Sequence, residues 1–300
     1  MMKEKTSAKK IVTSDKVVRI VVVVVMALLS LSYVFMYLWL LLNSFRTSGD
    51  FLGDSFKIFD LKNFTLENYL DKEYGLFNVQ IAGSRRNPVY LSDAIVNTIV
   101  LVFGQVALHI TIPAITAYII AKYNFKIRKF ILDLAIVTMV IPTVGSLPVL
   151  YRFMTNLNLT NKYLGIFLMS SGGLGFGFLL FRNFFAAIPW DYAESAFLDG
   201  ASDWTVFIKI MYPQAVPIIS AIAITSFISC WNDYFTAYIY LPEKPTISLG
   251  VNQLYTKMRN KNMLPVAFAG MTVLATVSLA VFAVFNKSIM NNMSAGGIKG

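Results

Sequence analysis

Few side chains in this sequence could perform chemistry on their own. The chain has one histidine, His109, and one cysteine, Cys230, and both lie inside apolar runs. An enzyme in the membrane would need a nucleophile with a base, or a cluster of metal ligands, and the apolar runs hold no paired acids. The glycine-rich stretch at 170–178 lacks the lysine of a phosphate-binding loop, and glycines spaced for close helix packing explain it better. We therefore expect no catalytic residue, and no metal or cofactor bound by this chain.

Polar residues inside two of the apolar runs could line a path for a solute. In the first run they fall on one side of a predicted helix, where they should face protein or a water-filled path: Asn97, Thr98, Gln105 and His109. In the second run a charged Asp233 would be energetically costly in hydrocarbon, so we expect its carboxylate to have a binding partner or to face an aqueous cavity. Its neighbours Trp231, Asn232 and Tyr234 include two rings that could stack on a sugar or anchor a helix at the membrane interface.

These residues must be positioned by helices that cross a membrane. Hydrophobic residues make up 56% of the 300 residues, charged residues 14%, and the mean hydropathy is +0.62, which is outside the range of soluble domains. A spanning helix needs about 20 mostly apolar residues. Six segments reach that length: 17–42, 91–121, 131–151, 163–182, 214–240 and 264–286. The net charge of +10 indicates basic flanks facing anionic lipid, and we expect no nucleic-acid partner.

The positions of lysine and arginine predict the orientation. The tail at 1–16 carries five lysines and should be cytoplasmic. With six spans the C-terminus is cytoplasmic too, and the basic cluster at 122–130 also lies inside. The segment at 43–90 must then lie outside, although it also carries basic residues. Residues 17–300 are expected to form a single membrane domain.

The stretch 186–213, which we call the loop unit, is polar between two apolar runs. Pro189 suits a helix start, Gly200 can end that helix in a left-handed conformation, and Ser202 or Asp203 can cap a second helix that runs to Pro213. Small residues near the turn would let another protein approach closely. A solvated connecting loop is the alternative on these grounds.

The loop unit resembles the cytoplasmic loop of permease subunits of binding-protein-dependent ABC importers. That loop carries Glu-Ala-Ala, three residues, Gly, nine residues and Ile-x-Leu-Pro. This sequence has the same spacing, with Ser in place of the first Ala and Tyr212 in place of Leu. The matching residues are Glu194, Ser195, Ala196, Asp199, Gly200, Ala201, Ile210 and Pro213. The stretches "WNDY" at 231–234, "PTISLGVNQL" at 245–254 and "AGGIKG" at 295–300 are similar to the maltose-permease-like branch of the carbohydrate importers.

The resemblance implies an all-α membrane protein with the ABC importer type I permease fold, six transmembrane helices and a cytoplasmic coupling helix in the loop unit. It implies a multi-pass subunit in a bacterial cell membrane that imports a sugar or oligosaccharide by alternating access. The partners implied are a second homologous permease, a cytoplasmic ATPase dimer that uses ATP and Mg, and an extracellular solute-binding protein. An importer of another solute is the alternative. A secondary transporter should show internal repeats and mid-membrane ionisable groups, and the sequence has no clear repeat and few such groups.

Overall fold

The computed structural model describes residues 2–57, 64–83, 88–141 and 145–293, and helices dominate them. The helices are α1 Met2–Ser44, α2 Ser48–Gly53, α3 Glu67–Leu70, α4 Leu91–Lys122, α5 Arg128–Val140, α6 Ser146–Asn156, α7 Tyr163–Ser170, α8 Phe176–Ala187, α9 Asp191–Leu198, α10 Asp203–Val206, α11 Tyr212–Gln214, α12 Val216–Asn232, α13 Phe235–Tyr240, α14 Ile247–Asn260 and α15 Leu264–Met293. A π-helical turn covers Phe207–Met211. Two antiparallel strands, β1 Ala82–Gly83 and β2 Pro88–Val89, form a minimal hairpin that the sequence did not predict.

Three of the predicted spans are single long helices. Within the described residues, Lys16–Ser44, Leu91–Lys122 and Leu264–Phe285 are each long and apolar enough to cross a membrane. A fourth crossing is available if Asp203–Gln214 and Val216–Asn232 act together, although they are bent by 73°. Helix α1 begins at Met2, so residues 2–16 of the predicted tail are helical and continuous with the first predicted span.

The other predicted spans are built from shorter helices. The segment 131–151 contains parts of α5 and α6, and the segment 163–182 contains α7 and part of α8. The break between α7 and α8 has a packing reason. A Cβ on Gly173 would lie 3.1 Å from Cγ2 of Ile112 on α4, and the Gly173 carbonyl accepts a hydrogen bond from Thr116 at 3.3 Å. Gly173 therefore allows close packing, but at a chain break and not within a helix, while Gly172 and Gly175 have no such neighbour.

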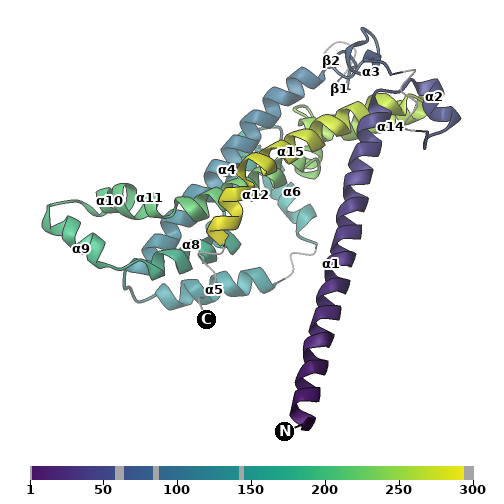
Figure 1. Ribbon diagram of the computed structural model, residues 1–300. Coiled ribbons are helices and arrows are strands. Elements are labelled where there is room, and N and C mark those ends of the chain that lie inside the picture. The colour runs from purple at the N-terminus through teal and green to yellow at the C-terminus, as the bar shows by residue number, and fades with distance from the viewer. Residues whose placement is uncertain (1, 58–63, 84–87, 142–144, 294–300) are drawn as a thin grey trace.

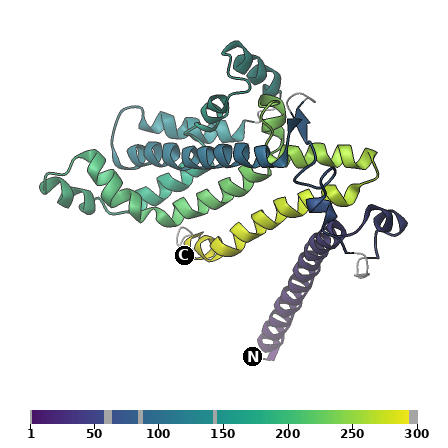
Figure 2. The same cartoon turned by 90° about the horizontal axis from the view of Figure 1, so that it is seen from above.

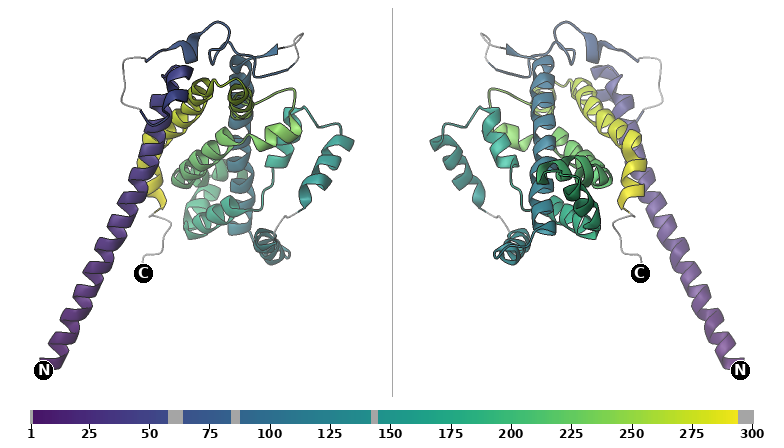
Figure 3. Two further views of the ribbon diagram at one scale, coloured as in Figure 1. Left: turned by 90° about the vertical axis from the view of Figure 1, so that its right-hand side faces the viewer. Right: turned by 90° about the vertical axis from the view of Figure 1, so that its left-hand side faces the viewer.

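Helix α4 is the central element, since α7, α8, α12 and α14 all pack against it. Helix α15 packs on α12, α14 and α1, and both α15 and α1 diverge from α4 (Figure 2). Most side chains of α1 from Lys16 to Leu38 are exposed and apolar, as expected for a surface that faces lipid. Figure 3 shows that this part of α1 extends away from the other helices. Two main apolar clusters hold the fold together. One joins α4, α8 and the loop unit, and the other joins α4, α14 and α15.

The short elements of segment 43–90 gather where α4 begins, and the loop unit lies near the end where α4 finishes (Figure 1). Arg46, one of the basic residues that complicated the topology prediction, is buried at 4% exposure. Its guanidinium donates hydrogen bonds to Asn43 Oδ1 and to the carbonyls of Asp50 and Asp54 at 2.8–3.0 Å. This charge therefore supports local structure. The stretch 295–300, which carries one of the family-like motifs, lies outside the described residues.

Candidate functional site

The first half of the loop unit is a short helix closed by a left-handed glycine. Helix α9 begins at Asp191, after an N-cap at Trp190, so Pro189 lies before the cap and not at the predicted first helical position. Gly200 has φ of +82°, and its N–H donates to the Phe197 carbonyl at 3.0 Å while Ala201 N–H donates to the Ala196 carbonyl at 2.9 Å. This pair of bonds is a Schellman motif, which satisfies the carbonyls at the helix end. The predicted turn at Gly200 is confirmed.

The second half runs from Ser202 to a bend after Pro213. The Ser202 hydroxyl accepts the Thr205 N–H at 3.3 Å, which confirms Ser202 as the cap. The helix then widens into the π-helical turn Phe207–Met211 directly before Tyr212 and Pro213. Since proline has no N–H and its ring clashes with the preceding turn, the regular ladder cannot continue there. The bend of 73° that follows turns the chain into α12.

The loop unit has an inner and an outer face. Ala193, Val206 and Met211 are fully buried against α4 and α8. On the outer face Leu198 is 90% exposed. The helices α9 and α10 project beyond the rest of the fold (Figure 1). The tip of the unit therefore presents a large apolar side chain beyond the packed part of the fold.

The structure places the eight motif residues together in this unit. Glu194 lies on the first turns of α9 with an exposed side chain, and Ser195 Oγ donates to the Asp191 carbonyl at 2.9 Å. The turn residues Asp199 and Gly200 are exposed, while Ala196, Ala201 and Ile210 are half-buried. Pro213 is exposed beside the bend. Small side chains thus surround a turn whose acidic groups are accessible.

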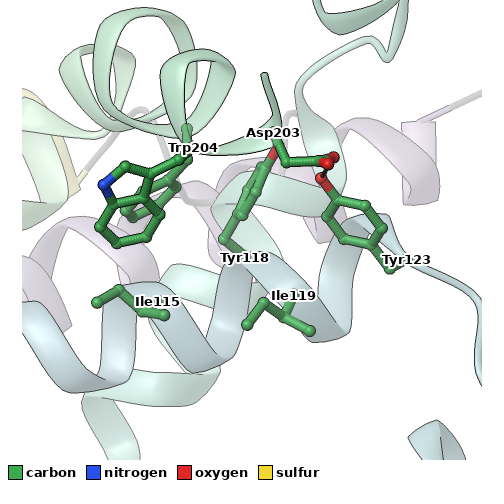
Figure 4. A pocket seen from close by; sticks show the side chains of 7 residues that line it. Ile115, Tyr118, Ile119, Tyr123, Asp203 and Trp204 are labelled. Atoms are coloured by element: carbon green, nitrogen blue, oxygen red, sulfur yellow. Dashed lines mark hydrogen bonds between the residues drawn. The ribbon is translucent and has the colours of Figure 1, made fainter.

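The end of α4 holds the loop unit through contacts that sequence reasoning missed. Lys122 Nζ donates to the Ile188 carbonyl and lies 5.9 Å from the centroid of the Trp190 ring. Tyr123 donates its hydroxyl proton to Asp203 Oδ1 at 2.6 Å (Figure 4). Burial and this hydrogen bond raise the pKa of Tyr123, so its hydroxyl stays protonated as the donor. From the sequence, residues 122–130 are interpreted only as a basic cluster that faces the cytoplasm, and contacts with the loop unit are not predicted.

Polar residues of α4 face protein, as the stripe predicts. Asn97 Nδ2 donates to the Pro245 carbonyl at 3.0 Å, and Asn97 Oδ1 accepts the Tyr163 hydroxyl at 2.6 Å. Gln105 Nε2 donates to Ser170 Oγ at 3.0 Å. His109 is half-buried, and within the described residues its ring makes no hydrogen bond. Asn97 and Gln105 therefore tie α4 to neighbouring segments in this conformation.

The stretch 231–234 breaks the helix at the α12–α13 junction. Trp231 is buried, stacks on Phe227 at 5.8 Å and donates Nε1–H to the Leu274 carbonyl at 3.2 Å. The Asp233 carboxylate accepts the N–H groups of residues 235 and 236 at 2.9 and 3.1 Å, which begins α13. Two residues of the stretch remain accessible, Asn232 and Tyr234.

A small cavity is lined by residues from both groups of predicted path residues, the polar residues of α4 and the stretch 231–234. Gln105, Asp233, Thr236 and Thr246 line it with five apolar or sulfur-bearing residues, and its volume is about 10 Å³. A space of this size holds about one water molecule and no sugar. Among the described residues no group of three or more His, Cys, Asp or Glu side chains could hold a metal.

Thr98 gives a stability prediction. Its buried hydroxyl accepts the Ile247 N–H at 2.8 Å and joins α4 to α14. Thr98→Val keeps the shape but leaves that N–H unpaired, so we expect a loss of about 1–3 kcal/mol in the free energy of unfolding. Thermal unfolding in detergent should show a lower midpoint. Thr111→Val, on the exposed face of the same helix, is the control and should leave the midpoint unchanged.

Comparison with known proteins places this chain in a class. Residues 109–294 match the family described as binding-protein-dependent transport system inner membrane component. The match covers more than half of the chain, and the chain belongs to this family of transport permeases. Together with its long apolar helices, this makes it an integral membrane protein.

Two relatives and one solved structure define the similarity further. The chain is 28% identical to the arabinooligosaccharides transport system permease protein AraQ of Halalkalibacterium halodurans over 272 residues, 89% of this chain and 91% of that protein. It is 26% identical to the maltodextrin transport system permease protein MalD of Streptococcus pneumoniae over 249 residues, 82% of this chain and 87% of that one. It also superposes on a chain from the crystal structure of a bacterial ABC transporter involved in the import of the acidic polysaccharide alginate. The TM-score is 0.69 and the identity is 20%, and the superposition covers 91% of this chain and 97% of that chain. The predicted fold class, a helical ABC importer permease, is confirmed.

Proposed function

We propose that this chain is a permease subunit of an ATP-driven importer for a sugar or oligosaccharide. The observation that carries the proposal is the loop unit, a projecting helix-turn-helix with exposed Glu194 and Leu198, anchored to the central helix of a family permease. The relatives' names, which include permeases for arabinooligosaccharides and maltodextrin, support a carbohydrate as the solute.

In this proposal the loop unit is the coupling site. Helix α9 docks on a cytoplasmic ATPase, which hydrolyses ATP with Mg, while a second homologous permease completes the path. An external binding protein delivers the solute to the side where segment 43–90 gathers. Both chain termini are then cytoplasmic, in agreement with the lysines of the tail at 1–16. The membrane is that of a bacterial cell.

The path residues belong to the same proposal. Asn232 and Tyr234 are the accessible members, while the buried Trp231 and the bonded Asn97 hold the helices in place. Since the cavity between Gln105 and Asp233 is too small for a sugar, the solute would pass along a surface completed by the second permease. His109 is the least supported of the predicted path residues.

The test is purification of a tagged chain from its native membrane. We expect an ATPase, a second permease and a binding protein to co-purify, and the reconstituted complex to import at least one of maltotriose and arabinotriose when ATP is supplied. Absence of an ATPase from the complex would overturn the proposal. Import of neither sugar, while a solute that is not a carbohydrate is imported, would overturn the carbohydrate assignment and keep the permease function.

A further inference from the structure

The end of α4 is joined to both halves of the loop unit. Lys122 contacts the beginning of the unit, at the Ile188 carbonyl and the Trp190 ring. The next residue, Tyr123, bonds to Asp203 at the start of the second helix, 80 positions along the chain. Two consecutive residues thus connect the end of α4 to the residues that follow α8 and to the start of α10. Any movement of the unit must act on this end of α4.

The second helix packs on α4 along one side only, where the Phe207 ring lies 4.9 Å from the Tyr118 ring. Beside this contact a pocket of about 360 Å³ lies between Trp204 and the α4 residues Ile115 and Ile119, and its other lining residues are Tyr118, Tyr123, Asp203 and Phe207 (Figure 4). On the pocket side no close packing of Trp204 against Ile115 and Ile119 resists a change in their separation. Among the described residues the Tyr123–Asp203 hydrogen bond is the polar link across this gap. A phenol donating to a carboxylate at 2.6 Å is a strong, charge-assisted bond.

We propose that Tyr123 and Asp203 are positioning residues that make α4 move with the loop unit, so that ATP hydrolysis is converted into solute movement. The inference rests on the proposed function. With the bond in place, a displacement of α10 is carried to α4. Without it, the apolar contacts of the cluster around Phe207 remain, and a smaller part of the displacement reaches α4.

Helix α4 can carry such a movement to the far side of the fold. It runs as one helix of 32 residues from Leu91 to Lys122. Near its other end Asn97 bonds to the Pro245 carbonyl, and Thr98 bonds to the Ile247 N–H, which joins α4 to the start of α14. The same helix carries Gln105 at the small cavity beside Asp233. A shift of its last turn therefore reaches the proposed path residues through a continuous helix.

The experiment uses the complete complex in proteoliposomes and measures ATP hydrolysed per sugar imported, with maltotriose or arabinotriose as the probe. Tyr123→Phe keeps the ring, which packs on Tyr118 and Trp190 at 5.8 and 5.9 Å, and removes only the hydroxyl. We expect it to raise this ratio by about tenfold or more, the scale of one charge-assisted bond, with the ATPase still bound. Asp203→Asn keeps an acceptor without charge and should raise the ratio less.

Two further variants make the test specific. Tyr123→Phe combined with Asp203→Ala should be no worse than Asp203→Ala alone, because the two side chains act as one link. The control Tyr33→Phe, on the exposed face of α1, should leave the ratio unchanged. An unchanged ratio in Tyr123→Phe, or loss of ATPase binding in that variant, would overturn the positioning role. If the unaltered complex neither binds an ATPase nor imports either sugar, the failure lies with the proposed function.

Discussion

Gly200→Pro should abolish solute import while the rest of the membrane domain still folds. Gly200 has φ of +82°, which proline cannot adopt, and its N–H donates to the Phe197 carbonyl in the turn. Loss of both features disfavours the turn by about 3 kcal/mol, equivalent to roughly a 100-fold shift away from the docking geometry. ATP-dependent import in proteoliposomes should fall on the order of 100-fold. The ATPase should bind more weakly.

A control variant and a double variant make this test more specific. Gly49→Ala, at an exposed glycine with open space around it and no positive φ, should leave import unchanged. Adding Glu194→Ala to Gly200→Pro removes the accessible acid of α9 as well, and no ATPase should then co-purify. If the double variant bound the ATPase and imported solute normally, the loop unit would not be the coupling site.

Phe185→Ala should cause the largest loss of stability among single substitutions at the base of the loop unit. Phe185 is fully buried, with Tyr118, Phe181 and Phe207 at centroid distances of 5.6, 6.1 and 6.4 Å. Removing a buried phenyl ring leaves a cavity between α4, α8 and the π-helical turn, at a cost of about 3–5 kcal/mol. The midpoint of thermal unfolding in detergent should fall accordingly.

The matched control for this change lies on the same helix. Phe176 is 67% exposed at the start of α8, so Phe176→Ala removes the same atoms without a cavity. Its unfolding midpoint should stay close to that of the unaltered protein. Equal losses in the two variants would mean that the aromatic cluster does not hold the loop unit.

The sequence predicts the turn chemistry of the loop unit well because that chemistry is local. A glycine at the end of a short helix, followed by Ser202 and later by Pro213, restricts the backbone whatever surrounds it. The same holds for the long apolar helices α1, α4 and α15, where length and hydropathy suffice.

Tertiary contacts decide the features that the sequence did not predict. Gly173 interrupts a predicted span because its backbone approaches Ile112 and Thr116 of α4, which are distant in the chain. Lys122 and Tyr123 bind groups 66 and 80 positions away, and nothing in their local sequence indicates those partners. Trp231 looks like a ring available to a sugar, yet α15 supplies a carbonyl that holds it inside.

A photocrosslinking measurement tests the central claim most directly. Leu198 at the end of α9 and Leu70 at the end of α3 are both exposed leucines, 90% and 63% accessible, on opposite sides of the fold in our proposal. Each would be replaced by p-benzoylphenylalanine in the co-purified complex and irradiated. We predict that Leu198, and not Leu70, crosslinks to the subunit carrying an ATP-binding phosphate loop. Crosslinking of that subunit from position 70, or from neither position, would contradict the coupling of ATP hydrolysis through the loop unit.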